Sequence, residues 1–219
     1  AFHGCRRTNH QPLSAGVGMR ALSLVDIAVW DALARSRGLG IARLLGGQPR
    51  SRVATSIVGY PPSMTPAGLA EEIYGLIERG WRRFKAPVAA DADATVARMV
   101  AAREAAGDGW LGFDANYSLP SVDAASDLEE RMRDLDLGWI EDPLPQGDAH
   151  AIAELRRRGR TPLAVGDDQG GSYHPEALLA AGAIDVLRVD ATSGGGVSGI
   201  ARVIAQAEAA GVPVSPHMF

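Results

Sequence analysis

The feature that most constrains the fold of this 219-residue sequence is an alternation, after Pro49, of short apolar runs with alanine-rich amphipathic stretches. Such alternation of strands and helices builds a parallel sheet, because each crossover helix returns the chain to the same end of the sheet. The predicted strands are 53–59, 82–86, 110–114, 138–141, 163–166, 186–190 and 212–216. The predicted helices between them are 67–78, 92–106, 122–135, 149–158, 175–181 and 197–210.

Polar residues stand at the carboxyl ends of six predicted strands and decide between two kinds of parallel sheet. Their separations are 29, 27, 26, 23 and 27 residues, one strand–helix unit each time. In a (β/α)₈ barrel such strand ends converge on one pocket, whereas a doubly wound open sheet spreads them out. We therefore predict an α/β chain with a (β/α)₈-type TIM barrel. The six residues are Lys85, Asp114, Glu141, Asp167, Asp190 and His217.

The composition restricts the partners and the compartment. With 46% hydrophobic residues, 22% charged residues, a net charge of −4 and scattered Lys and Arg, the chain is globular,. We expect a small-molecule partner and neither nucleic acid nor membrane, since no apolar run is long enough to span a bilayer. A single cysteine, Cys5, rules out an internal disulfide framework and fits a reducing compartment, so a cytoplasmic location is predicted,.

Three of the strand-end residues, Asp114, Glu141 and Asp167, are carboxylates that consecutive barrel strands would bring to one ion. Oxygen-only ligands suit Mg²⁺, with Mn²⁺ as the alternative, and the lack of Cys and His among them argues against zinc. Acidic residues also decorate strand-end loops without binding metal, but three in register favour the metal site. Asp142 and Asp168 adjoin these ligands and are expected to bond backbone groups or to support the ligands.

On the far side, Asp190 and His217 end neighbouring predicted strands and would form a carboxylate–imidazole dyad. The Asp fixes the tautomer of the His and raises its basicity, so that the His can take a proton near neutrality. A proton on the carbon next to a carboxylate is too weakly acidic for histidine alone, so metal and base belong to one mechanism. The remaining histidines are interpreted as structural; they are His3, His10, His150 and His174.

With these residues placed, the chain resembles the mandelate racemase and muconate lactonizing branch of the enolase superfamily. The resemblance rests on SLVDIAVWDALARSRGLGIARLLGG and GWRRFKAPV, followed in the family order by FDAN, WIEDPL, GDD and PVSPH. It implies magnesium on Asp114, Glu141 and Asp167, and an acid/base dyad of Asp190 and His217. It also implies a homo-oligomer and an enzyme that dehydrates acid sugars, or racemises or epimerises α-substituted carboxylates.

The resemblance also divides the chain into two predicted domains. Residues 1–52, with one long and one short helix predicted over 21–45, are the remnant of an α+β capping domain and its closing helices. Residues 53–219 are the modified, enolase-like barrel. The 167 residues after position 52 fall short of the roughly 250 of a typical barrel, so the last unit is predicted to be absent,.

One departure from the family bears on the reaction. Many relatives place Lys-x-Lys at the second strand, where this chain has Lys85-Ala86-Pro87, and proline cannot move protons,. Lys85 could contact the substrate carboxylate or act as a displaced acid; an ordinary surface lysine is the alternative. Because a single histidine suffices for β-elimination of water, the sequence favours an acid-sugar dehydratase over a racemase or epimerase. The candidate substrate contacts are Tyr60, Asn116 and Tyr117.

Two further interpretations stay open. A barrel without its last strand could be a catalytically inactive remnant with a binding or assembly role, because unpaired strand edges leave it open to partners. The run Gly194–Gly196 could cradle a phosphate at a helix N-terminus in an unrelated barrel enzyme,. These glycines follow the sixth strand, however, and barrel phosphate sites usually follow the seventh or eighth.

Overall fold

The computed structural model describes residues 16–48, 55–60, 63–145, 148–167 and 173–217. The chain divides into two compact units. We call Val53–Val165 with Ala181–Asp185 the five-strand unit. We call Ala1–Arg52, Gly166–Ala180 and Val186–Phe219 the two-strand unit. One unit border coincides with the predicted domain border at residue 52, and the two-domain division itself stays a prediction.

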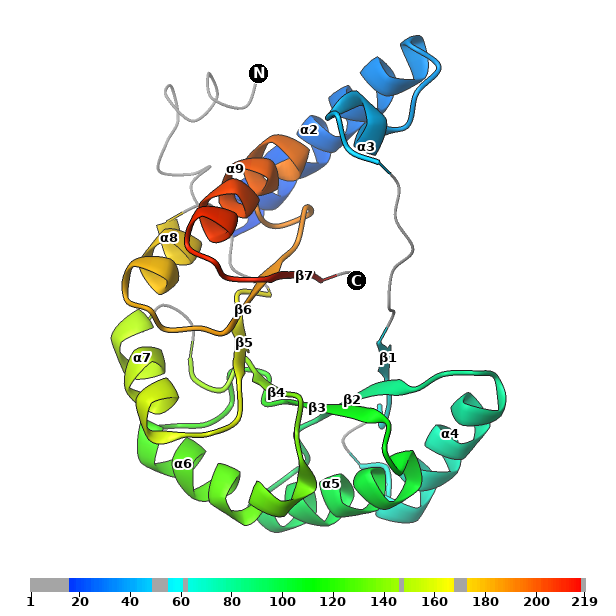
Figure 1. Ribbon diagram of the computed structural model, residues 1–219, viewed down its shortest axis with the longest axis vertical. Coiled ribbons are helices and arrows are strands. Elements are labelled where there is room, and N and C mark those ends of the chain that lie inside the picture. The colour runs from blue at the N-terminus through cyan, green and yellow to red at the C-terminus, as the bar shows by residue number, and fades with distance from the viewer. Residues whose placement is uncertain (1–15, 49–54, 61–62, 146–147, 168–172, 218–219) are drawn as a thin grey trace. The chain divides into compact units, whose positions relative to one another are not determined.

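The five-strand unit alternates parallel strands and helices, as the sequence predicts. Each strand pairs in parallel with the next one along the chain, and Figure 1 shows the helices in an arc along one side of the strands. The strands are β1 (Ser56–Ile57), β2 (Arg83–Pro87), β3 (Trp110–Asp114), β4 (Trp139–Glu141) and β5 (Leu163–Val165). The helices are α4 (Pro66–Glu78), α5 (Ala92–Ala106), α6 (Val122–Arg131), the 3₁₀ turn η1 (Arg133–Leu135) and α7 (Ala149–Arg158).

Side-chain caps explain where these helices begin. Thr65, Asp91, Ser121 and Asp148 each accept a hydrogen bond from the backbone N–H three residues later. Such a cap satisfies one of the N–H groups that the first helical turn leaves without a partner, and is worth roughly 1 kcal/mol. The four starts are thus encoded locally in the sequence.

The strands of this unit carry different chemistry on their two faces. Phe84, Leu111 and Phe113 are fully buried and share one parity along the strands, and fully buried residues of the helices such as Ile73 and Met99 complete the core,. Side chains of the other parity leave the sheet on the opposite face. Lys85, Asp114 and Glu141 have this second parity, so the fold gathers them on one face.

Pro87 does not shorten β2, which runs to this residue and pairs it with Asp114. The N–H of Val88 donates to the carbonyl of Asp114, so an N–H at position 87 would point the other way, towards β1. Because β1 already ends at Ile57, the hydrogen bond that proline cannot make falls beyond the neighbouring strand,. Proline is therefore tolerated at this strand end.

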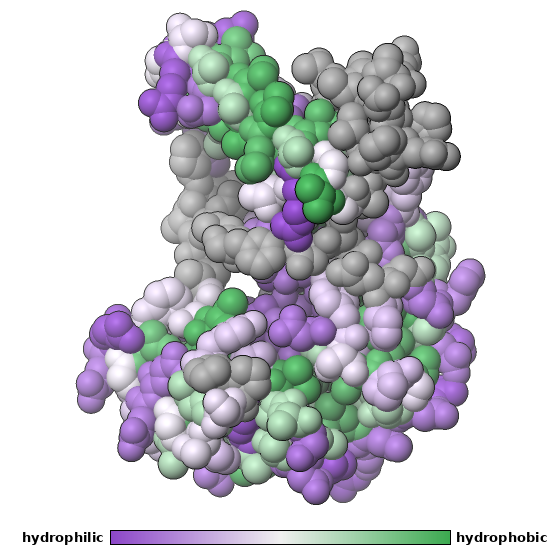
Figure 2. Space-filling model, turned by 180° about the vertical axis from the view of Figure 1, so that it is seen from behind, coloured by the Kyte–Doolittle hydropathy of each residue, from purple (hydrophilic) through white to green (hydrophobic). Residues whose placement is uncertain are grey.

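The two-strand unit contains α2 (Gly16–Ser36), α3 (Ile41–Leu44), α8 (Tyr173–Ala180), β6 (Val186–Val189), α9 (Gly196–Ala209) and β7 (Val214–Pro216). β6 and β7 pair in parallel. Figure 2 shows an apolar strip over α2, to which the exposed Leu24, Val25 and Val29 belong. None of the helices in the described ranges combines the length and the hydropathy that a membrane span needs.

Polar side chains of α2 fill the N-terminus of α9. The Asp26 carboxylate accepts the Ser198 N–H at 3.0 Å, and the Ser23 hydroxyl accepts the Gly195 N–H at 2.9 Å. Gly196 has φ +71°, and a Cβ there would lie 2.5 Å from Asp26. The phosphate-cradle interpretation of Gly194–Gly196 is therefore wrong, because a carboxylate of the same chain already occupies the anion-binding end of the helix.

Candidate active site

In the five-strand unit, Lys85 lies between two of the predicted metal ligands. Its Nζ is 2.8 Å from Asp114 Oδ2 and 2.5 Å from Glu141 Oε1. Lys85 is only 3% exposed and Glu141 is fully buried, so the interpretation of Lys85 as a surface lysine is wrong. Burial by itself would lower the pKa of Lys85, but the charges and hydrogen bonds of Asp114 and Glu141 outweigh burial and raise this pKa above its usual value,.

Asp142 adds a third carboxylate to this group. It is almost fully buried, and one of its carboxylate oxygens lies within 4.8 Å of one from Glu141, so both could contact the same ion. Its backbone is fixed on two sides, because its N–H donates to the Ala164 carbonyl and its carbonyl accepts the Tyr117 N–H. The sequence suggested only a supporting role for Asp142, and this position makes it a further candidate ligand.

The predicted substrate contacts lie in loops that follow strands. Asn116 is exposed and Tyr117 is half-buried; both have positive φ, and the Asn116 N–H donates to Asp114 Oδ1 at 3.0 Å. The backbone at Asn116 therefore helps to hold the Asp114 carboxylate. Tyr60 follows β1 and is 58% exposed. Substrate contact by these three side chains stays a prediction.

A pair of charged residues, the half-buried Glu72 and the buried Arg98, holds the peptide next to Tyr60. Glu72 Oε2, on α4, accepts the Gly59 N–H at 2.8 Å, and Arg98 Nη2, on α5, donates to the Gly59 carbonyl. Gly59 has φ +80°, and a Cβ would collide with Arg98. We call Glu72, Arg98 and Gly59 the β1-loop clamp. The sequence analysis missed it, since helix residues 13 and 39 positions away carry no local signal of this contact.

In the two-strand unit, His217 lies between two carboxylates. Its Nδ1 is 2.8 Å from Asp190 Oδ2 and its Nε2 is 3.0 Å from Asp167 Oδ2. Asp190 is 3% exposed, which by itself would raise its pKa. Hydrogen bonds from the Thr192 hydroxyl and N–H, together with His217, outweigh this burial and lower the pKa of Asp190. The structure thus brings the predicted dyad together and adds Thr192 as a partner.

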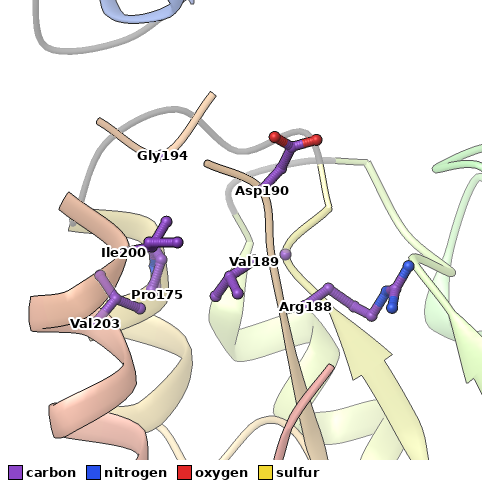
Figure 3. Close-up of a pocket in the computed structure, with 8 residues that line it drawn as sticks. Pro175, Arg188, Val189, Asp190, Gly194, Ile200 and Val203 are labelled. Atoms are coloured by element: carbon purple, nitrogen blue, oxygen red, sulfur yellow. The ribbon is translucent and has the colours of Figure 1, made fainter. Parts of the chain in front are cut away.

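Arg188, on β6, is a further residue of this site that the sequence analysis missed. Its guanidinium donates to Ser215 Oγ at 2.7 Å and to the Pro216 carbonyl at 3.1 Å, and Asp167 Oδ1 lies 3.5 Å away. In Figure 3, Val189 faces the small cavity with Ile200 and Val203, while Arg188 extends away on the other side of β6. Arg188 therefore links the strand end that carries His217 to the Asp167 carboxylate.

The other predicted residues fall outside these two groups. Burial lowers the pKa of His174 to about 4, which keeps its ring neutral near pH 7, and His150 is exposed. The structural interpretation of both stays a prediction. His3, His10, Cys5 and Asp168 lie outside the described residues.

Residues 68–219 match a family model described as enolase C-terminal domain-like. The chain is 30% identical to D-galactarolactone cycloisomerase of Agrobacterium fabrum over 93% of this chain and 55% of that protein. It is also 30% identical to D-galactonate dehydratase of Verminephrobacter eiseniae over 92% of this chain and 54% of that protein. The chain therefore spans about half the length of these curated relatives.

Solved structures give the same result for the fold. An L-talarate dehydratase from Polaromonas sp. JS666, complexed with Mg and L-glucarate, aligns with a TM-score of 0.90 at 28% identity. A racemase from Streptomyces coelicolor A3(2) with bound magnesium aligns with a TM-score of 0.93 at 26% identity. Each alignment covers 100% of this chain and 61% of the other. The predicted fold class, an incomplete enolase-like (β/α)₈ barrel, is confirmed, and the chain belongs to the enolase superfamily, in its mandelate racemase-like branch.

Proposed function

We propose that this chain is the barrel part of a magnesium-dependent acid-sugar dehydratase. The enzyme would remove the α-proton of a carboxylate substrate and then eliminate water from the β-carbon. The observation that carries the proposal is the contact of His217 with Asp190, which provides a general base at a strand end of an enolase-type barrel,. The dehydratases among the relatives support this reaction class.

The residues of the five-strand unit fit a divalent metal. The Lys85 ammonium, held by Asp114 and Glu141 together, demonstrates that a cation can be accommodated between these carboxylates. All donors are oxygens, which suits Mg²⁺ and also Mn²⁺. We propose Asp114, Glu141 and Asp167 as the ligands, with the motif order of the family as the reason for including Asp167. Bound magnesium would stabilise the negative charge that develops on the substrate carboxylate as the proton leaves.

His217 and Asp190 supply the proton transfers. His217 would accept the α-proton at Nε2, while Asp190 beside Nδ1 holds the ring in orientation and stabilises the imidazolium,. The same imidazolium can then protonate the departing β-hydroxyl. One residue thus covers both steps of a syn elimination.

A racemase or epimerase is the second candidate, because the aligned Streptomyces coelicolor protein is a racemase. Two-base racemisation needs a proton carrier on each face of the substrate. Pro87 stands where many relatives have the second lysine, and Lys85 is held as a cation between two carboxylates. The chain therefore offers better chemistry for elimination than for inversion. The inactive-remnant hypothesis predicts no magnesium binding and is tested below.

The deciding experiment is α-proton exchange in deuterated water with Mg²⁺ across a panel of acid sugars, followed by NMR. Deuterium uptake with a keto product supports the dehydratase, whereas inversion without water loss supports the racemase. Absence of α-proton exchange with every acid sugar of the panel, together with no magnesium affinity, supports the inactive-remnant hypothesis. His217→Asn is the negative control and His150→Asn, at an exposed position on α7, is its matched control. A homo-oligomeric assembly and a cytoplasmic location stay parts of this proposal.

A further inference from the structure

Lys85 is the buried cation of the proposed metal site. We propose that Lys85 is a counter-ion that takes the place of the metal in the metal-free protein and weakens the affinity of the site for the metal. This inference rests on the proposed metal site of Asp114 and Glu141. It assigns Lys85 a positioning role, which differs from the proton-transfer and substrate-binding roles predicted from the sequence.

Lys85 relieves the repulsion between the Asp114 and Glu141 carboxylates. Asp114 is 8% exposed and Glu141 is fully buried, and oxygens of both contact the same ammonium. Two buried carboxylates this close repel each other strongly, because the interior screens charge poorly. The ammonium cancels this repulsion and holds both oxygens at hydrogen-bonding distance. The carboxylates therefore keep their orientation without a metal.

The other cation of β2, Arg83, makes a different contact. Arg83 shares the parity of Lys85 on β2, but its guanidinium lies over the Trp110 ring at 4.0 Å,. The residues next to Lys85, Phe84 and Ala86, are fully buried on the core side of the sheet. Of the two cations on β2, Lys85 is therefore the one that contacts the carboxylates.

An incoming metal ion would meet the Lys85 ammonium at the carboxylates. A divalent cation would use the oxygens that Lys85 now occupies, and the lysine stem is too buried to carry its charge far away. The ammonium would therefore compete for the carboxylates and repel the metal. Removing the Lys85 charge should lower the stability of the metal-free protein and increase metal affinity, and these two effects have opposite signs. If Lys85 had a merely structural role, its substitution would lower both the stability of the metal-free protein and the metal affinity.

The test uses the full chain with Lys85→Met and Lys85→Gln, and Mn²⁺ as the probe. Free Mn²⁺ is measured by electron paramagnetic resonance, Mg²⁺ by competition, and thermal unfolding is recorded with and without metal. We expect both variants to bind Mn²⁺ roughly tenfold more tightly than wild type, because a like charge in a poorly screened site is removed. Their unfolding midpoints should fall without metal and recover with it.

Arg83→Met is the matched control, since it removes a positive charge of the same strand and parity that does not contact the carboxylates. Its Mn²⁺ affinity should equal that of wild type. Weaker Mn²⁺ binding by both Lys85 variants, an unchanged midpoint without metal, or failure to fold at saturating Mn²⁺ would each overturn the inference.

Failure of the proposed function gives a different pattern. If wild type and both Lys85 variants all fail to bind Mn²⁺, the metal site itself is wrong and the inference falls with it. If wild type binds Mn²⁺ and the variants bind it more weakly, only the inference falls. If the variants bind and wild type does not, Lys85 blocks the site and the inference stands.

Discussion

In each unit of the molecule, carboxylates surround a nitrogen-containing side chain, but the side chain differs between the units. In the five-strand unit, buried carboxylates surround the Lys85 ammonium, whose raised pKa keeps it charged at neutral pH. In the two-strand unit, the Asp167 and Asp190 carboxylates lie at the two ring nitrogens of His217, and imidazole is a common side chain for proton transfer. A group of constant charge suits the holding of ligands, and a titratable ring suits proton transfer. This difference is the reason for proposing metal binding at the Lys85 cluster and proton transfer at the His217 cluster.

The largest expected effect tests the role of the two-strand unit. His217→Asn should reduce α-proton exchange of an accepted acid sugar by on the order of a thousandfold, because it removes the general base. Asp190→Asn should cost less, since the imidazole remains and only its orienting carboxylate is lost. NMR exchange rates in deuterated water measure both. A larger loss in Asp190→Asn than in His217→Asn would contradict the assignment of His217 as the base.

The second prediction compares the units by stability. Glu141→Gln, without metal, should lower the free energy of unfolding by about 3 kcal/mol, because it leaves a buried ammonium with one carboxylate fewer,. Asp190→Asn should cost about 1 kcal/mol, since the oxygen of its amide can still accept the hydrogen bonds of Thr192,. Urea unfolding of both variants gives the comparison. Equal losses in the free energy of unfolding would mean that the Lys85 cluster does not depend more strongly on its carboxylates than the His217 cluster does.

The sequence predicted the regular parts of this fold closely. The helices α5 and α7 have the predicted bounds, and β3 does as well, since apolar periodicity, caps and β-branched or aromatic runs act locally,. The helix predicted over 122–135 is an error, because it divides into α6 and η1, and Asp136 after η1 has a left-handed conformation. The long and the short helix predicted over 21–45 correspond to α2 and α3, although α2 already begins at Gly16. Gly38, with φ +63°, lies between them.

Only those residues of the candidate site that stand at the ends of predicted strands could be predicted from the sequence. Register identified Lys85, Asp114 and His217, because parallel strand ends meet at one face. It could not identify Arg188, whose partners Ser215 and Pro216 are 27 and 28 residues away, or the β1-loop clamp. Nor could it separate a buried Lys85 from an exposed one, because a single lysine in an apolar strand fits both. These contacts depend on tertiary packing, which leaves no periodic pattern in the sequence.

The third prediction concerns the β1-loop clamp, which neither cluster contains. Arg98→Met should lower the free energy of unfolding by roughly 2 kcal/mol, because it leaves the Gly59 carbonyl and the Glu72 carboxylate without this donor or countercharge,. Hydrogen exchange at Gly59 and Tyr60 should rise at least tenfold, more than in β3. Arg131→Met, in an exposed ion pair with Asp93, is the matched control and should leave this exchange unchanged,. A uniform rise in exchange across the unit would argue against a local clamp.

The smallest expected effect is a pH dependence that separates the two clusters. The pKa of Lys85 is raised above its ordinary value of 10.5, so its stabilisation is complete below that pH and is lost as pH rises through the folded-state pKa,. The pKa of Asp190 is lowered, so its stabilisation is present above the ordinary aspartate pKa of 3.8 and is lost as pH falls through the folded-state value,. Urea unfolding of wild type from pH 8 to 11 should therefore show a loss of stability above about pH 10.5 that Lys85→Met lacks. The same alkaline loss in both proteins would mean that the ammonium between the carboxylates contributes nothing to the folded state.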